Sequence, residues 1–110
     1  MYAISPQTYS EISFFFRRIH DNFVEKGFWK EKKNPLIIPT KLALIHDEVD
    51  EALREHRKIP DDMVHFAEEL ADIVIRVVDL AEHLNINLLD EIVMKQHAND
   101  KRPPMHGKKY

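Results

Sequence analysis

Residues 41–74 read KLALIHDEVDEALREHRKIPDDMVHFAEELADIV. The stretch holds two segments whose apolar residues recur at helical spacing, joined by the short break KIPDD. Each segment carries two carboxylates three residues apart, Glu48 with Glu51 and Glu69 with Asp72. Residues three apart are neighbours on one face of a helix. Two such helices packed antiparallel would therefore bring four carboxylates into one small volume.

A group of carboxylates needs positive charge nearby. Two of them about 5 Å apart repel by roughly 3 kcal/mol at an effective dielectric constant near 20. A divalent cation, Lys or Arg side chains, or bound protons can offset this repulsion. Oxygen ligands in a chain without cysteine select hard ions, so we expect Mg²⁺, with Mn²⁺ as the second choice. Mg²⁺ held by a few carboxylates keeps water and takes substrate phosphate as its other ligands, which indicates phosphate chemistry.

The composition predicts one all-α domain spanning residues 1–110. The chain is 44% hydrophobic and 32% charged, as in an ordinary globular protein. Its two glycines are too few for the turns that many short strands would need. The absence of cysteine excludes a disulfide framework and a thiol nucleophile. The sequence has neither a signal-peptide pattern at its start nor the ~20-residue apolar run that crosses a membrane. We therefore expect a cytoplasmic protein without a membrane partner.

The net charge of −3 is unevenly distributed. Residues 47–72 hold ten acidic residues against three Lys or Arg, whereas residues 95–110 hold five Lys or Arg against one acidic residue. An acidic centre is a poor surface for duplex nucleic acid. A basic end that can face an acidic, metal-loaded centre is better suited to a small polyanion.

Capping signals bound four helices. Ser5 precedes Pro6, which suits the first helical position, and Thr40 precedes the second apolar pattern. Asp61 and Asn87 occupy the same place before the third and fourth patterns. The expected helices cover residues 6–26, 41–57, 62–84 and 88–99, followed by a tail at residues 100–110.

The third expected helix is apolar over more than half of its circumference. Such an arc is too wide for a surface helix of a monomeric bundle, so we expect this helix to be central or to pack against another subunit. Its narrow polar strip holds Glu69, Asp72 and Arg76. Polar residues confined to one strip of a mostly buried helix indicate a functional site.

Residues 27–39 form the one long expected loop. Trp29 lies there beside Lys30, Lys32 and Lys33. An indole in a loop can stack on a nucleobase while lysines contact phosphates. Alternatively, Trp29 closes the end of the helix bundle, and the composition of the loop slightly favours that role.

The basic end offers a second group of donors. Lys95 and Asn99 are four residues apart and share a helix face. Together with Lys101 and Arg102 they could donate to a triphosphate. The alternative is that this segment is a frayed, solubilising end.

The motif Glu48-x-x-Glu51, a gap of 17 residues, then Glu69-x-x-Asp72 resembles the ExxE…ExxD signature of the MazG-like nucleotide pyrophosphohydrolases, in the all-α NTP pyrophosphatase superfamily. The resemblance extends over nearly the whole chain. It implies a four-helix bundle-like MazG-type fold whose subunits pair as a dimer or a dimer of dimers. It also implies Mg²⁺-dependent cleavage between the α- and β-phosphates of a nucleoside triphosphate, giving a monophosphate and pyrophosphate.

The resemblance also implies roles for single residues. One carboxylate not fully used as a ligand, Glu48 or Glu51, would take the proton of the attacking water. The apolar run PLIIP at residues 35–39 departs from the more polar sequence that relatives often have there. The implied metal ligands are Glu48, Glu51, Glu69 and Asp72, the phosphate or sugar contacts are Lys95, Asn99 and Arg102, and the base contacts are His20 and Trp29.

Two other functions fit the same sequence. The fold could bind nucleotide and metal without turnover, as a sensing or sequestering module. Alternatively, the chain could be a structural helical oligomer whose acidic residues are surface charge. The sequence leaves the base, the sugar and the number of metal ions open.

Overall fold

The structure, a computed structural model, describes residues 4–60 and 63–110. Within these ranges the chain forms four α-helices and no strand, which confirms the all-α prediction. None of the described helices is long and apolar enough to span a bilayer. The helices are α1 (Pro6–Glu25), α2 (Ile37–His56), α3 (Met63–His83) and α4 (Leu88–Asp100), followed by the short 3₁₀ turn η1 (Pro104–Gly107).

Two of the predicted helix starts are confirmed. The side chain of Ser5 accepts a hydrogen bond from the backbone N–H of Thr8 at 3.1 Å, and Pro6 opens α1. Asn87 Oδ1 accepts from the backbone N–H of Asp90 at 3.0 Å and so caps α4. In both cases a short polar side chain satisfies an N–H group that the helix leaves unpaired. The predicted cap at Asp61 lies outside the described residues.

The predicted start of α2 is wrong. Helix α2 begins at Ile37, and the backbone N–H of Thr40 donates to the carbonyl of Leu36 at 2.9 Å, so Thr40 lies inside the helix. Pro39 does not prevent this, because the first-turn N–H groups of a helix have no intrahelical partner. Asn34 Oδ1 accepts from the N–H of Leu36 at 2.9 Å in the turn that precedes α2. The loop before α2 is therefore shorter than the sequence predicts.

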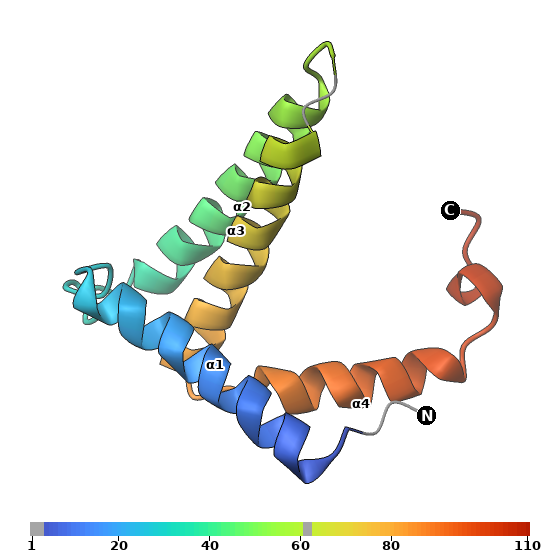
Figure 1. Cartoon of the computed structure of the whole chain (residues 1–110), viewed down its shortest axis with the longest axis horizontal. Helices are drawn as coiled ribbons and strands as arrows, with labels where there is room; N and C mark the ends of the chain where they lie inside the picture. The colour runs from blue at the N-terminus through green and yellow to red at the C-terminus, as the bar shows by residue number, and fades with distance from the viewer. Residues whose placement is uncertain (1–3, 61–62) are drawn as a thin grey trace.

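Helices α2 and α3 form one long arm, and α1 crosses the base of that arm (Figure 1). Helix α1 packs on α3, so α3 contacts both neighbours, as its wide apolar arc predicts. Helix α4 leaves the base in a different direction and carries the C-terminal segment with it (Figure 1). This packing is consistent with a bundle, but the chain is open, with a radius of gyration of 16.6 Å against about 13 Å for a compact domain of this length.

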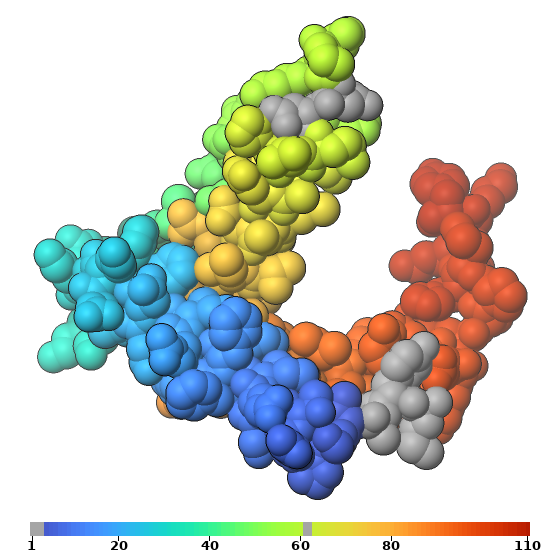
Figure 2. All heavy atoms as spheres, in the orientation of Figure 1, coloured from blue at the N-terminus to red at the C-terminus, as the bar shows by residue number. Residues whose placement is uncertain are grey.

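The open shape leaves much apolar surface exposed. The chain exposes 8604 Å², whereas a compact monomer of 13.0 kDa exposes roughly 6,300 Å². On α3, Leu70 is 46% exposed and Val74 59%, so the neighbouring helices do not cover its apolar arc. Figure 2 shows the α2–α3 arm and the α4 segment separated by open space. Among the described residues, the buried apolar ones are Trp29, Ala52, Val78, Ala81 and Leu89.

Candidate functional site

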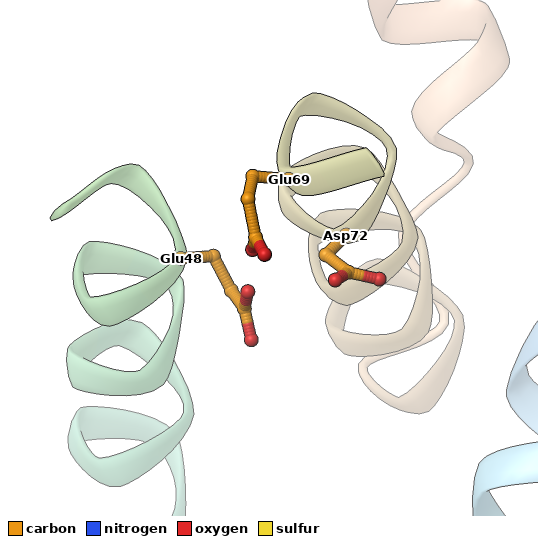
Figure 3. Close-up of side chains that lie close together, drawn as sticks. All are labelled: Glu48, Glu69 and Asp72. Atoms are coloured by element: carbon orange, nitrogen blue, oxygen red, sulfur yellow. The ribbon is translucent and has the colours of Figure 1, made fainter. Parts of the chain in front are cut away.

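Three carboxylates meet across the α2–α3 arm. Glu48 comes from α2, while Glu69 and Asp72 come from α3, and one oxygen of each lies within 4.8 Å of the other two. Figure 3 shows Glu48 reaching from its helix toward Glu69 and Asp72 on the neighbouring one. Glu48 and Glu69 are half-buried and Asp72 is exposed. We call these three side chains the carboxylate cluster; they are three of the four carboxylates whose convergence the sequence predicts.

A single arginine contacts the carboxylate cluster among the described residues. Arg76, one turn beyond Asp72 on α3, donates from Nε to Glu48 Oε1 at 2.9 Å. Arg76 and Glu48 are both largely shielded from solvent, at 22% and 16% side-chain exposure, so the screening of their attraction is reduced. One guanidinium against three carboxylates leaves a local excess of negative charge.

This excess contributes to a raised pKa of Glu69. Partial burial raises the pKa of Glu69 first, and a hydrogen bond with Glu48 raises it further. The negative charges of Asp72, Glu48 and Glu51 act in the same direction. Each cause disfavours the ionised form of Glu69. The carboxylate cluster therefore favours a bound proton or a bound cation. Exposed acidic groups are also common in proteins without a bound ion. We therefore call the carboxylate cluster a candidate site.

Glu51 lies outside the carboxylate cluster. Its Oε1 accepts a hydrogen bond from Arg54 Nη2 at 2.8 Å, and its side chain is 47% exposed. Because Glu51 is three residues from Glu48, the two side chains start from neighbouring positions on α2. The ligand and base roles of Glu51 remain predictions.

The predicted phosphate-binding residues lie on a different part of the molecule. Lys95 and Asn99 are on α4 and Arg102 follows it, whereas the carboxylate cluster is on the α2–α3 arm (Figure 1). Lys95 and Arg102 are exposed. Asn99 is half-buried, and its Oδ1 is buried without a hydrogen-bond partner among the described residues. A single chain thus does not bring these donors to the carboxylates.

The predicted base contacts, His20 and Trp29, lie together in a buried junction with Asp79. Trp29 Nε1 donates to Asp79 Oδ1 at 2.9 Å, and His20 Nδ1 lies 2.7 Å from the same oxygen. Trp29, His20 and Asp79 are 4%, 7% and 3% exposed. Asp79 is a functional candidate that the sequence patterns did not predict, although an acidic residue inside the apolar run IVIRVVDLA indicates buried partners.

Lys41 and His83 complete this junction. The Lys41 ammonium donates to the carbonyl of Phe28 at 2.7 Å and lies 4.4 Å from the centroid of the Trp29 ring. The His83 ring stacks on Trp29 with centroids 3.7 Å apart and planes inclined by 11°. Burial lowers the pKa of Lys41, and the negative charge of Asp79 opposes that shift. We call His20, Trp29, Lys41, Asp79 and His83 the Asp79 junction.

These contacts fit the alternative in which Trp29 closes the end of the bundle. Its indole N–H is used by Asp79, and its ring contacts His83 and Lys41. The base-binding role of Trp29 remains a prediction. A cavity of about 380 Å³ adjoins Trp29 and is the place where a base could bind. It is lined by His20, Val24, Trp29, Lys30, Lys32 and His83.

No protein-family model, curated protein or solved structure matches this chain. The spacing of the carboxylates in the sequence and their approach across the α2–α3 arm are therefore the features that indicate a function.

Proposed function

We propose that this chain is a Mg²⁺-dependent nucleoside triphosphate pyrophosphohydrolase that cleaves the α–β phosphate bond to give a monophosphate and pyrophosphate. The observation that carries the proposal is the approach of Glu48, Glu69 and Asp72 to within 4.8 Å from two different helices. The spacing of the ExxE and ExxD pairs, which resembles that of the MazG-like enzymes, supports the same function.

The chemistry of the carboxylate cluster fits Mg²⁺. All three ligands are carboxylate oxygens, which hard cations such as Mg²⁺ and Mn²⁺ prefer. Mg²⁺ is six-coordinate, so three protein oxygens leave positions for water and for phosphate oxygens. Partial burial and mutual repulsion, the causes that raise the pKa of Glu69, would be relieved by a divalent charge.

The residues would divide the work of the reaction. Glu48, Glu69 and Asp72 would hold the ion, and Glu51 would join them if its side chain rotated away from Arg54. When bound, Mg²⁺ would supply the charge that polarises a phosphoryl oxygen and lowers the pKa of water. Of the two candidate bases, Glu51 suits proton removal from water better than Glu48, because its carboxylate lies outside the carboxylate cluster. Phosphoryl transfer depends mainly on positioning and charge neutralisation, so donors from Lys95, Asn99 and Arg102 complete the site.

We further propose that the protein acts as a dimer or a dimer of dimers. The chain exposes roughly 2,300 Å² more than a compact monomer would, and stable interfaces bury about 800 Å² on each partner. The uncovered apolar residues Leu70 and Val74 on α3 would pack against a second copy. In such a dimer, one copy could bring Lys95, Asn99 and Arg102 to the carboxylate cluster of the other copy. Sedimentation equilibrium should give a multiple of 13.0 kDa, and a 13.0 kDa species at micromolar concentration would contradict this part of the proposal.

A nucleotide panel with product identification tests the enzymatic proposal. We expect pyrophosphate and a monophosphate from at least one common ribo- or deoxynucleoside triphosphate. Asp72→Asn and Glu51→Gln should each lower the rate more than about 100-fold, because each removes a charge at the site. Asp47→Asn is the matched control on the exposed side of α2 and should retain the activity. No release from any common nucleotide with Mg²⁺ or Mn²⁺ would refute the proposal.

The Arg76–Glu48 ion pair favours a second candidate. Because Arg76 already neutralises part of the negative charge, the carboxylates could be surface charge on a structural helical oligomer. In that case Mg²⁺ would leave the melting temperature unchanged, whereas a ligand specific to the folded state raises it. Saturable, Mg²⁺-dependent nucleotide binding without product would instead identify a non-catalytic binding module.

A further inference from the structure

Asp79 contacts the ring nitrogens of both His20 and Trp29. Its Oδ1 lies 2.7 Å from His20 Nδ1 and 2.9 Å from Trp29 Nε1, and its Oδ2 lies 3.2 Å from the same indole nitrogen. An indole N–H can only donate, so both carboxylate oxygens act as acceptors toward Trp29. Burial lowers the pKa of the nearby Lys41 ammonium, and the negative charge of Asp79 opposes that shift.

This arrangement fixes the tautomer of His20. A carboxylate acceptor at 2.7 Å requires the ring proton on Nδ1. In the neutral imidazole the other nitrogen, Nε2, then carries a lone pair and accepts hydrogen bonds. The described residues give Nε2 no hydrogen-bond partner, and it is not among the buried unpaired atoms. Nε2 is thus left for a ligand or for water.

His20, the residue that carries this acceptor, lies at the cavity beside Trp29. His20 lines the cavity of about 380 Å³ together with Trp29, His83 and the apolar side chain of Val24. Lys30 also lines this cavity, as does Lys32, and both ammonium groups can only donate. Asp79 and Asp72 are seven residues apart on α3, which is about 10 Å along a helix. The carboxylate that contacts His20 and Trp29 therefore lies about two helical turns from the carboxylate cluster along α3.

We infer that Asp79 is a positioning residue that holds His20 in the Nδ1–H tautomer. The cavity consequently prefers bases that present an amino group to His20 over bases that present a carbonyl group in the same place. The inference rests on the proposed function, in which His20 and Trp29 contact the base. Cytosine and uracil differ at one such position, as do adenine and hypoxanthine. A site built to pair with one hydrogen-bonding group discriminates strongly against its opposite, because the mismatch leaves buried polar atoms unpaired.

Asp79→Asn reverses the direction of this hydrogen bond while keeping both partners satisfied. The amide oxygen can accept from Trp29 Nε1, and the amide N–H can donate to His20 Nδ1. The ring proton then moves to Nε2, which becomes a donor toward the cavity. For the full-length protein, we expect the ratio of kcat/KM for cytidine triphosphate over uridine triphosphate to fall by about tenfold or more. An unchanged ratio in a folded Asp79→Asn variant would overturn the inference.

Nitrogen-15 NMR of the imidazole rings provides a readout that does not depend on turnover. The wild-type protein should show His20 as the Nδ1–H tautomer, and Asp79→Asn should show the Nε2–H tautomer. Trp29→Phe is the matched control, because it removes the other donor to Asp79 and should leave the His20 tautomer unchanged. An Nε2–H tautomer in the wild-type protein would overturn the inference.

Nucleoside titrations separate this inference from the proposed activity. In the wild-type protein, cytidine should shift the resonances of His20 and Trp29 at lower concentration than uridine. If that preference is found and no nucleotide is hydrolysed, the enzymatic proposal fails and the role of Asp79 stands. If pyrophosphate is released and the wild-type protein binds uridine as well as cytidine, the role of Asp79 fails and the enzymatic proposal stands. The wild-type measurements decide the question even where Asp79→Asn does not fold.

Discussion

The α2–α3 arm carries two clusters of polar side chains about two helical turns apart, and they are built in opposite ways. In the Asp79 junction each group meets a complementary one: a carboxylate accepts from two ring N–H groups, and a buried ammonium donates to a carbonyl. In the carboxylate cluster three like charges face each other with a single arginine in contact. His20 and Asp79 are under 10% exposed, whereas Asp72 is exposed.

This difference separates a cluster whose charges are compensated within the chain from one whose charges are not. Buried polar atoms are retained where they are hydrogen-bonded, and the Asp79 junction satisfies that condition within the chain. The carboxylate cluster raises the pKa of Glu69 and leaves negative charge uncompensated, so it gains most from an added cation. We therefore expect substitutions in the Asp79 junction to change stability and substitutions in the carboxylate cluster to change metal binding.

Replacing each of two aspartates of α3 with alanine should give the largest difference in unfolding free energy between the two clusters. Asp79→Ala leaves two buried N–H groups without an acceptor and the Lys41 charge without its counterpart, and should cost about 3–5 kcal/mol of unfolding free energy. Asp72→Ala removes an exposed member of a repulsive group and should change stability by less than about 0.5 kcal/mol. Urea unfolding in EDTA measures both. Equal losses would remove the distinction between the two clusters.

Lys41→Met tests the cation of the Asp79 junction with a smaller expected effect. The apolar stem is retained, but the hydrogen bond to the Phe28 carbonyl and the contact with the Trp29 ring are lost. Loss of a hydrogen bond to a charged group should cost about 1.5–3 kcal/mol in urea unfolding. Lys33→Met, at an exposed position in the loop before α2, is the control and should change stability by less than about 0.5 kcal/mol. An unfolding free energy of Lys41→Met equal to that of the wild-type protein would contradict the proposed role of the Lys41 ammonium.

The smallest effect is expected from His83, as a dependence of stability on pH. Burial lowers the pKa of His83 below its ordinary 6.5, the nearby His20, Lys32 and Lys41 side chains lower it further, and Asp79 opposes them. The unfolded chain then binds a proton more readily than the folded one. The unfolding free energy should therefore fall as the pH drops from 6.5 through the lowered pKa.

His83→Phe isolates this contribution, because phenylalanine keeps an aromatic ring on Trp29 and does not titrate. Urea unfolding at about pH 7.5 and about pH 5.5 should show a smaller loss of stability in the variant than in the wild-type protein. An identical loss in both proteins would mean that His83 does not sense pH in the folded chain.

The helices and the carboxylate cluster could be predicted because they follow from local rules. Helical periodicity places Glu69 and Asp72 on one face, and antiparallel packing across a short break brings Glu48 opposite them. The start of α2 was missed because Thr40 is a good cap by composition, while the tolerance of the first helical turn for Pro39 allowed an earlier start.

The Asp79 junction could not be derived from local patterns. Asp79 meets His20 and Trp29 across 59 and 50 residues of sequence, and only the packing of α1 and the loop against α3 brings them together. The direction of α4 is equally non-local. Its sequence predicts a helix of the right length, but not that Lys95 and Asn99 would lie apart from the carboxylates of the same chain.

Thermal unfolding of the wild-type protein and of Glu69→Gln, each in EDTA and in saturating Mg²⁺, tests the central claim most directly. In EDTA the variant should melt at a higher temperature than the wild-type protein, because it lacks one of the mutually repelling charges. In Mg²⁺ the wild-type protein should gain several degrees, the variant should gain little, and their order should reverse. Melting temperatures that keep the same order in both conditions would show that Glu48, Glu69 and Asp72 do not bind the ion.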